Sequence, residues 1–397
     1  MLTVEEALQR LLAHAQPVAG AEQVAALEAG GRVLAAPVVS PIAVPPLANS
    51  QMDGYAVRCA DVTAAGVRLR VSQRIAAGRV GRPLEPGTAA RIFTGAPIPE
   101  GADAVVMQEA TSVDGDWVTL HEAPRPGQWI RRAGLDIEAG STVLEAGVRL
   151  RAPHVGLAAS IGLAALPVKP RLRVAVFFTG DELVMPGEPL PPGRIYNSNR
   201  FMLRAALQEL GCEVSDLGIV PDSLAATRAA FARAAEAADL IVTSGGVSVG
   251  EEDHVKAAVQ AEGTLELWQI AMKPGKPLAF GWVRGVPFIG LPGNPVSSFV
   301  TLLLFARPFI LKRQGVADVT PRALPLRADF ELTKADKRRE FLRVRVNAQG
   351  GLELFPNQNS AVLTSCAWAD GLVDNPAGQP IARGATVSYL PFSELTR

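Results

Sequence analysis

Apolar and polar positions follow different periods in different parts of the chain. Between residues 171 and 313, continuous apolar runs such as RLRVAVFF alternate with segments of helical period. Continuous runs are typical of strands buried in a parallel sheet, and their alternation with helices is typical of a doubly wound α/β domain. Residues 51–130 instead carry short apolar runs between turn residues, which predicts a small β-rich module.

The flanking segments predict a helix, a linker and a last β module. Thr3 and Glu6 can form a capping box at the start of a first amphipathic helix. The proline-rich residues 36–50 suit an extended linker, so a domain boundary is expected near residue 44. Residues 144–170 are predicted to return and pack on the first helix, which would make the β-rich module an insertion. Residues 320–397 resemble the strands of a small β-barrel or sandwich.

Composition limits the classes of function. The 397 residues are enough for two to four domains, and Lys plus Arg equals Asp plus Glu at 39 each, so no global basic field recruits nucleic acid. Three distant cysteines and four histidines show neither a disulfide framework nor zinc spacing. Residues 286–306 carry no charge, but prolines and a glycine interrupt them, so a buried strand and helix are expected and not a membrane span. The acidic first residues do not resemble a signal peptide, and we expect a cytoplasmic protein.

The most informative stretch is DLIVTSGGVSVGEEDHVK, residues 239–256. Its apolar run ends at Ser244, continues through Gly245 and Gly246, and meets Glu251, Glu252 and Asp253. This order indicates a strand, a glycine turn that lets the backbone approach a ligand, and a helix start that suits an anion. A phosphate cradle beside carboxylates needs a cation between them, and Mg²⁺ binds carboxylates and phosphates together. The stretch therefore predicts a metal-assisted phosphate or pyrophosphate site.

Other strand ends should share the edge of the sheet with this turn, because carboxyl ends of parallel strands meet there and ligands bind there. The polar or glycine residues at these ends are Asp181, Glu182, Asp222, Ser244, Gly245, Gly246, Gly293 and Asn294. Lys273 and Lys276 lie either in a solvated turn or beside a phosphate-bearing ligand. The chain has neither the P-loop motif nor the Rossmann glycine motif.

Residues outside the α/β region have weaker signals. Asp53, Thr94 and Asp136 stand in sequences that ordinary turn chemistry explains. Arg338, Arg339 and Arg343 form either a basic patch or a solvated strand face, and Ser360 indicates nothing by its own surroundings.

Nine motifs in register carry a resemblance to a family. They are SQMDGYAV, RIFTGAPIPEGADAVVMQE, GLD at Asp136, TGDEL, GRIYNSN, TSGGVSVG, MKPGKP, LPGNPVSS and RREFLR. Over nearly its whole length the chain thus resembles the molybdopterin molybdenumtransferases, the family that includes the E domain of gephyrin. Phe178 departs from the usual Ser before TGDEL and is expected to alter the polarity of the rim. Glu252 and His254 vary the acidic tail of the glycine turn.

The resemblance implies a multidomain α/β plus β fold and a cleft shared by two subunits of an elongated homodimer. On this chain the parts are residues 1–43 with 137–170 as a linking domain, 44–136 as the inserted β-rich module, 171–318 as an α/β domain of molybdopterin-binding type, and 319–397 as a C-terminal β-barrel. The implied reaction transfers molybdenum from molybdate to adenylylated molybdopterin, hydrolyses its pyrophosphate linkage, and releases AMP and molybdenum cofactor.

The resemblance also implies a role for each candidate residue. Asp222 and Asp253 would hold Mg²⁺, with Glu182 as a further ligand or as a base that orients water. Ser244, Gly245 and Gly246 would cradle phosphate through backbone N–H groups, with Gly293 and Asn294 on the same rim. Lys276, Arg338 and Ser360 would receive molybdate, and Lys273 would balance phosphate charge. Asp53, Thr94 and Asp136 would reach the cleft from the partner subunit.

Two other readings stay open at this point. The chain could be a molybdopterin adenylyltransferase, although such proteins resemble only residues 171–313, or a non-enzymatic scaffold like its gephyrin relative. If the chain is a molybdopterin molybdenumtransferase, a molybdopterin adenylyltransferase would supply its substrate, and apo-molybdoenzymes or their chaperones would accept the cofactor. Neither nucleic acid nor a membrane is an expected partner.

Overall fold

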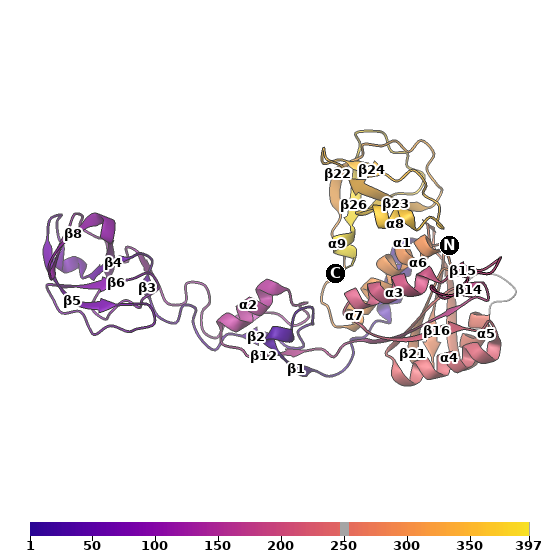
Figure 1. The fold of residues 1–397 in the computed structure, drawn as a ribbon, viewed down its shortest axis with the longest axis horizontal. Helices are drawn as coiled ribbons and strands as arrows, with labels where there is room; N and C mark the ends of the chain where they lie inside the picture. Colours follow the sequence, from indigo (N-terminus) through magenta and orange to yellow (C-terminus); the bar gives the residue numbers. More distant parts are fainter. Residues whose placement is uncertain (247–253, 397) are drawn as a thin grey trace.

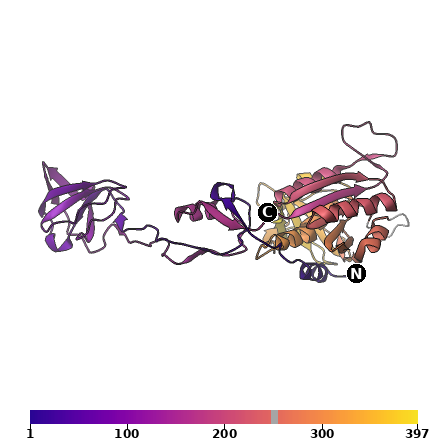
Figure 2. The same ribbon diagram turned by 90° about the horizontal axis from the view of Figure 1, so that it is seen from below.

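The computed structural model describes residues 1–246 and 254–396. The chain is drawn out along one axis in both views (Figure 1, Figure 2). The β-rich module lies at one end, a small linking domain lies in the middle, and the α/β and C-terminal domains lie together at the other end.

The α/β domain is built on a mixed six-stranded sheet with the order β16-β13-β17-β21-β20-β18. Its strands are β13 (Arg173–Thr179), β16 (Glu213–Val220), β17 (Leu240–Ser244), β18 (Gly263–Gln269), β20 (Pro277–Val283) and β21 (Val286–Leu291). The first four strands of the order are parallel, whereas β20 and β18 run antiparallel to their neighbours. The doubly wound prediction therefore holds for the parallel part of the sheet, and the antiparallel edge was not predicted.

Alternate side chains of the sheet face two separate cores. Val174, Val176 and Phe178 of β13 pack with α1 (Val4–Ala13), α3 (Ser198–Glu209), α6 (Pro295–Thr301) and α7 (Arg307–Arg313). Ala175 and Phe177 pack on the other face with α4 (Leu224–Ala237) and α5 (His254–Glu262). Both faces are therefore covered, as the continuous apolar runs require.

Phe178 does not alter the polarity of the rim. Its side chain is buried in the first of these cores, one residue before the strand ends. The pleat of β13 directs it into the layer of helices and not toward the ligand edge, so a phenyl group at this position contributes to packing.

The predicted helix starts are confirmed by side-chain caps. At α1, Thr3 and Glu6 form the reciprocal capping box. The Asn197 side chain caps α3, and the Ser223 side chain caps α4. Each cap satisfies backbone N–H groups that the first turn of a helix leaves unpaired.

The prediction that residues 144–170 pack on the first helix is wrong. Ala7 and Leu11 of α1 are buried in the α/β core. Residues 144–170 pack instead on the segment around Ala29, Leu34 and Val38, forming the core of the linking domain. Its elements are β1 (Glu22–Ala25) paired with β12 (Ala165–Val168), β2 (Val38–Val39) paired with β11 (Thr142–Leu144), and α2 (Ala152–Ser160). The apolar stripe of α1 showed that the helix is buried but not against which partner.

The chain passes from the linking domain into the β-rich module at β3 (Asn49–Ser50) and returns at β10 (Ile130–Arg131). These two strands pair antiparallel. Its sheet has the order β7-β4-β6-β5-β9-β8. The strands are β4 (Gly54–Val57), β5 (Arg68–Ile75), β6 (Thr88–Ile92), β7 (Ala104–Met107), β8 (Thr111–Asp114) and β9 (Trp117–Leu120). A Cβ atom on Gly54 would overlap the carbonyl group of Val106 on the neighbouring strand, so only glycine fits directly after Asp53.

The C-terminal domain is built on a sheet whose edge strand, β19, comes from the α/β region of the chain. Its order is β19 (Met272–Lys273), β23 (Arg339–Val346), β25 (Gly371–Asn375), β26 (Thr386–Pro391) and β22 (Leu324–Arg327), with β24 (Leu352–Leu354) paired to β23. Two short helices, α8 (Thr364–Trp368) and α9 (Phe392–Leu395), accompany it. The parallel pairing of β19 with β23 sets Lys273 directly opposite Glu340. This pairing attaches the C-terminal domain to the ligand edge of the α/β sheet.

The continuous helix Pro295–Arg313 includes a π-helical stretch, Leu302–Ala306. By length and composition alone it could cross a membrane. However, 78% of its most apolar window is buried inside the protein, as in the core helix of a globular domain.

Candidate active site

The order of strands places a switch point between β13 and β17. From β13 the chain crosses outward to β16, and it then returns past β13 to β17. Helices of the two crossovers lie on opposite faces of the sheet, and in open α/β sheets ligands bind beyond the carboxyl ends of the strands at such a point. The site is therefore expected where Thr179 and Ser244 end their strands.

Carboxylates occupy the outer side of this edge. Asp181 and Glu182 follow β13 and are exposed, and Asp222 follows the neighbouring strand β16. The backbone N–H of Asp222 donates to Asp181 Oδ1 at 3.4 Å, so the two loops lie side by side. Gly180 has a φ of +148°, and a Cβ atom there would press on the Glu182 carboxylate, so glycine lets this carboxylate fold back over the turn.

Oxygen ligands of this kind suit Mg²⁺, which prefers carboxylates shared with phosphate oxygens. Asp253, the predicted third ligand, lies outside the described residues. Among residues 1–246 and 254–396, no group of three or more His, Cys, Asp or Glu side chains could hold a metal by itself. A metal at Asp222 and Glu182 would thus need further oxygens from a ligand or from the segment that contains Asp253.

Ser244 joins three chain segments instead of facing a ligand. It is only 3% exposed, and its hydroxyl bonds the Pro292 carbonyl at 3.0 Å and lies 3.3 Å from Ser298 Oγ. The N–H of Gly245 donates to the Leu291 carbonyl at 3.2 Å. The Gly245 N–H is therefore already engaged, which is unfavourable to its predicted role as a phosphate donor, and the Ser244 hydroxyl, which had no predicted role, bonds within the protein.

The two glycines serve a close approach of the backbone. Gly245 and Gly246 have φ values of +97° and +65°, and a Cβ atom on Gly245 would lie 2.9 Å from the Thr179 carbonyl oxygen. A side chain at either position would be strained and would separate the ends of β13 and β17. Gly293 lies on the other side of Gly245, where its Cβ would be 3.8 Å from the Gly245 Cα. The three strand ends thus meet backbone to backbone.

Asn199 is a residue of this edge that sequence reasoning missed. Its Nδ2 donates to Ser244 Oγ at 2.9 Å and to the Gly293 carbonyl at 2.7 Å. The GRIYNSN motif ends with this residue, but the sequence assigned no role to it. The cap is Asn197, whereas Asn199 ties α3 to the ends of β17 and β21.

Cations lie farther along the same edge. Because β20 runs antiparallel to β21, Lys276 just before β20 lies beside the carboxyl end of β21. Lys276 and Arg338 line one cavity of about 510 Å³ together with Met1, Ala335, Asp336 and Lys337. The structure therefore brings together two of the three residues predicted to receive molybdate.

Ser360 lies nearby but does not line this cavity. Its carbonyl accepts from the N–H of Val296 at 3.1 Å, next to Gly293 and Asn294 at the start of α6. A loop of the C-terminal domain therefore reaches the rim at the end of β21.

Two carboxylates accompany the cations. Lys273 Nζ lies 3.1 Å from Glu340 Oε1 and 3.5 Å from Asp336 Oδ2. Arg338 donates from Nε and from a terminal nitrogen to the two Asp336 oxygens, each at 2.9 Å. These hydrogen bonds hold the pKa of Asp336 well below its usual range, so its carboxylate stays ionised.

The three arginines of RREFLR do not form one basic patch. Arg339 pairs with Asp374 and with Glu5 of α1. Arg343 is 1% exposed, bonds Ser365 Oγ and the Phe341 carbonyl, and has its pKa lowered to about 10 by burial. The physical reason is that α8 of the C-terminal domain, which contains Ser365, packs against β23 and covers Arg343. Only Arg338 borders the Lys276 cavity.

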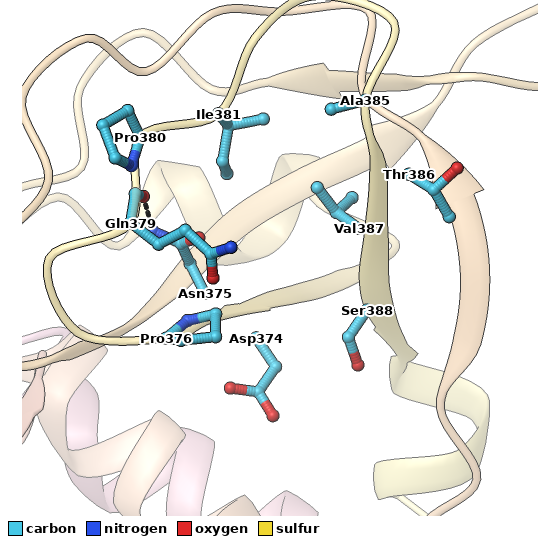
Figure 3. Close-up of a pocket in the computed structure, with 10 residues that line it drawn as sticks. All are labelled: Asp374, Asn375, Pro376, Gln379, Pro380, Ile381, Ala385, Thr386, Val387 and Ser388. Carbon is cyan, nitrogen blue, oxygen red and sulfur yellow. Dashed lines mark hydrogen bonds between the residues drawn. The ribbon is translucent and has the colours of Figure 1, made fainter.

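A second cavity of about 250 Å³ lies in the C-terminal domain, between β25, β26 and the loop that follows β25 (Figure 3). Its polar lining includes Asn375, whose Nδ2 donates to the Gln379 carbonyl at 2.9 Å. Asp374 at its mouth is already paired with Arg339. The residues that line it include no candidate from the sequence.

The β-rich module brings Asp53 and Thr94 together. Asp53 Oδ1 accepts from the backbone N–H and from the hydroxyl of Thr94, both at 2.8 Å, and these bonds lower the pKa of Asp53. Asp136 is exposed at the base of the module, where its N–H donates to the Val44 carbonyl. Within one chain the linking domain separates this module from the rim of the α/β sheet (Figure 1, Figure 2).

Comparison with known proteins extends over the whole chain. Three family descriptions match in order: MoeA N-terminal region (domain I and II) over residues 2–162, probable molybdopterin binding domain over 175–312, and MoeA C-terminal region (domain IV) over 325–392. The chain is 41% identical to molybdopterin molybdenumtransferase of Haemophilus influenzae, with 100% of both chains covered. It is also 41% identical to molybdopterin molybdenumtransferase 2 of Mycobacterium tuberculosis, with 98% of both covered.

A solved structure supports the same comparison. The molybdopterin biosynthesis MoeA protein from Pyrococcus horikoshii superposes with a TM-score of 0.83 at 31% identity, covering 99% of each chain. The agreement therefore includes the order of the domains as well as their separate folds.

Proposed function

The chain belongs to the molybdopterin molybdenumtransferase family, and on this premise we propose that it inserts molybdenum from molybdate into adenylylated molybdopterin. In the proposed reaction, water cleaves the pyrophosphate linkage and AMP leaves, while the two dithiolene thiols of the pterin bind the metal of the oxyanion and one of its oxo ligands leaves as water with the two thiol protons. The product is molybdenum cofactor.

One observation carries this proposal: a single sheet edge has carboxylates at one end, cations at the other, and a glycine turn between them. Asp222 follows β16 and Lys276 precedes β20, four strands away in the order of the sheet. Neighbouring strands are about 4.8 Å apart, so these positions are separated by roughly 19 Å. That length suits an extended nucleotide-bearing substrate whose two ends need different chemistry.

At the acidic end, Asp222, Glu182 and Asp253 are the residues that would hold Mg²⁺. The metal, when bound, would neutralise the pyrophosphate and make its bridging oxygen a better leaving group. Glu182, which is exposed above Gly180, would accept the proton of an attacking water. The Gly245–Gly246 turn brings the ends of β13 and β17 together, and the substrate would lie along the edge that these ends form.

At the cationic end, Lys276 and Arg338 would bind the oxyanion. A tetrahedral dianion needs several N–H donors, and the cavity of about 510 Å³ has room for one. Lys273, next to Glu340, would balance charge between the oxyanion and the phosphate. Ser360 would approach from the C-terminal loop that contacts the start of α6.

We further propose that the chain acts as a homodimer. Asp53, Thr94 and Asp136 belong to the β-rich module and its base, and the linking domain separates this module from the rim of the same chain (Figure 1, Figure 2), so they would complete the cleft of the partner subunit. Large apolar side chains along the linking segments, Val39, Ile42, Leu47 and Leu135, are exposed in the single chain. Their burial against a second copy would provide part of the free energy of association.

The alternatives account for less of the chain. Adenylyl transfer would leave the matched N-terminal and C-terminal regions without a role. A pure scaffold would not need the carboxylates and cations along one sheet edge. We place the enzyme in the cytoplasm, between an adenylyltransferase that supplies its substrate and the apo-molybdoenzymes or chaperones that receive the cofactor.

The proposed function is tested by supplying the purified full-length chain with adenylylated molybdopterin, Mg²⁺ and either molybdate or tungstate. We expect AMP and metallated cofactor to appear in equal amounts, and chelation of Mg²⁺ with EDTA to stop both. Chromatography of the nucleotide and absorbance of the metal dithiolene follow the two products. An absence of AMP with both oxyanions would overturn the enzymatic proposal.

A further inference from the structure

One of the side chains that line the cavity of Lys276 and Arg338 is negatively charged. Asp336 is part of the same lining, and both of its carboxylate oxygens accept from the Arg338 guanidinium. The same carboxylate also accepts from the backbone N–H of Arg338 at 3.0 Å. Such a two-point pair matches the way in which a guanidinium binds a phosphate or another oxyanion.

The charges around the cavity do not cancel. Lys276, Lys337 and Arg338 line the cavity with Asp336, and Lys273 and Glu340 are joined to it through ion pairs, so these six side chains carry a net charge of +2. Glu340 is occupied by Lys273 and by the Asp336 N–H. Asp336 is therefore the carboxylate that competes directly for the Arg338 donors.

We propose that Asp336 is a positioning and specificity-determining residue that holds Arg338 in place and weakens the affinity of the cavity for a tetrahedral dianion. The inference rests on the proposed function, because it takes this cavity as the site of the oxyanion. A weakened site has a consequence for transfer: the oxyanion stays exchangeable and can pass to the pterin sulfurs instead of remaining on the protein.

The sign of the effect separates this role from a structural one. Asp336→Asn retains the shape of the side chain and an oxygen that accepts from Arg338, but it removes one negative charge beside the bound dianion. The net charge of the cavity rises from +2 to +3, so oxyanions should bind about tenfold more tightly at low salt. If Asp336 only anchored the loop, the same change would leave affinity unchanged or reduce it.

A matched control exists in the same domain. Arg327 and Asp329 form another two-point pair two residues apart, at 2.7 and 3.0 Å, and the Asp329 pKa is also lowered. This pair is not part of the lining of the Lys276 cavity. Asp329→Asn should therefore leave oxyanion binding unchanged.

The test is calorimetric titration of the full-length protein with molybdate at two salt concentrations, comparing wild type, Asp336→Asn, Asp329→Asn and Lys276→Gln. We expect tighter binding only in Asp336→Asn, with a steeper dependence on salt. Equal or weaker binding in that variant, or the same gain in Asp329→Asn, would overturn the inference about Asp336. Failure of the proposed oxyanion site is a distinct outcome, in which wild-type binding is absent or insensitive to Lys276→Gln.

Discussion

Replacing Asp222 with Asn is expected to reduce AMP release by about a hundredfold or more while leaving the fold intact. Asp222 follows β16 at the rim, beside the loop that contains Asp181 and Glu182. Asparagine has the same size but lacks the charge that a divalent metal requires of its ligands. The loss should appear in the Mg²⁺-dependent rate, measured as AMP formed under saturating substrate, and added Mg²⁺ should restore only part of it.

Asp239→Asn provides the matched control. Asp239 lies just before β17, at the opposite edge of the same sheet, and its carboxylate pairs with Arg173 at 2.8 Å. This variant should lose about 1 kcal/mol of stability and no more than a small part of its turnover. Comparable loss of activity in both variants would mean that the Asp222 effect reflects the stability of the sheet and not metal binding.

Asp53→Asn is expected to lower turnover by about ten- to a hundredfold, although Asp53 lies far from the rim of its own chain. Asp53 Oδ1 accepts two hydrogen bonds from Thr94. An amide oxygen can accept the same two bonds, so the geometry should survive and only the charge is lost. Circular dichroism and the oligomeric state should match wild type, while AMP release falls.

A second aspartate of the β-rich module tests whether that loss is specific. Asp103 Oδ1 accepts from the Cys59 N–H at 2.7 Å and has not been assigned to the cleft. Asp103→Asn should retain nearly full turnover. If Asp53→Asn is as active as Asp103→Asn, the β-rich module takes no part in the chemistry.

The arrangement of the α/β rim was predictable because the signals were local. Continuous apolar runs marked the parallel strands, and a parallel sheet brings the ends of those strands to one edge. Asp222, the Gly245–Gly246 turn and Gly293 therefore lie at the ends of strands along one edge of the sheet. Caps such as Ser223 were predictable for the same reason, since a cap contacts only the turn that follows it.

The partners of individual polar groups were not predictable, because they come from distant parts of the chain. The hydroxyl of Ser244 is engaged by Pro292, and the Gly245 N–H by Leu291, nearly fifty residues later. Arg343 is buried beside Ser365 of α8, about twenty residues later, which its local sequence does not reveal. The same limit applies to α1, whose apolar stripe fitted either of two cores.

In the proposed homodimer, each active cleft combines the rim of one chain with the β-rich module of the other. Co-expression of Asp53→Asn and Asp222→Asn chains with different affinity tags, followed by isolation of the mixed dimers, tests this arrangement. One of the two clefts in each mixed dimer would contain both intact aspartates, so about half of the wild-type AMP release is predicted, although each variant alone is nearly inactive. Mixed dimers as inactive as the two parents would contradict the shared cleft.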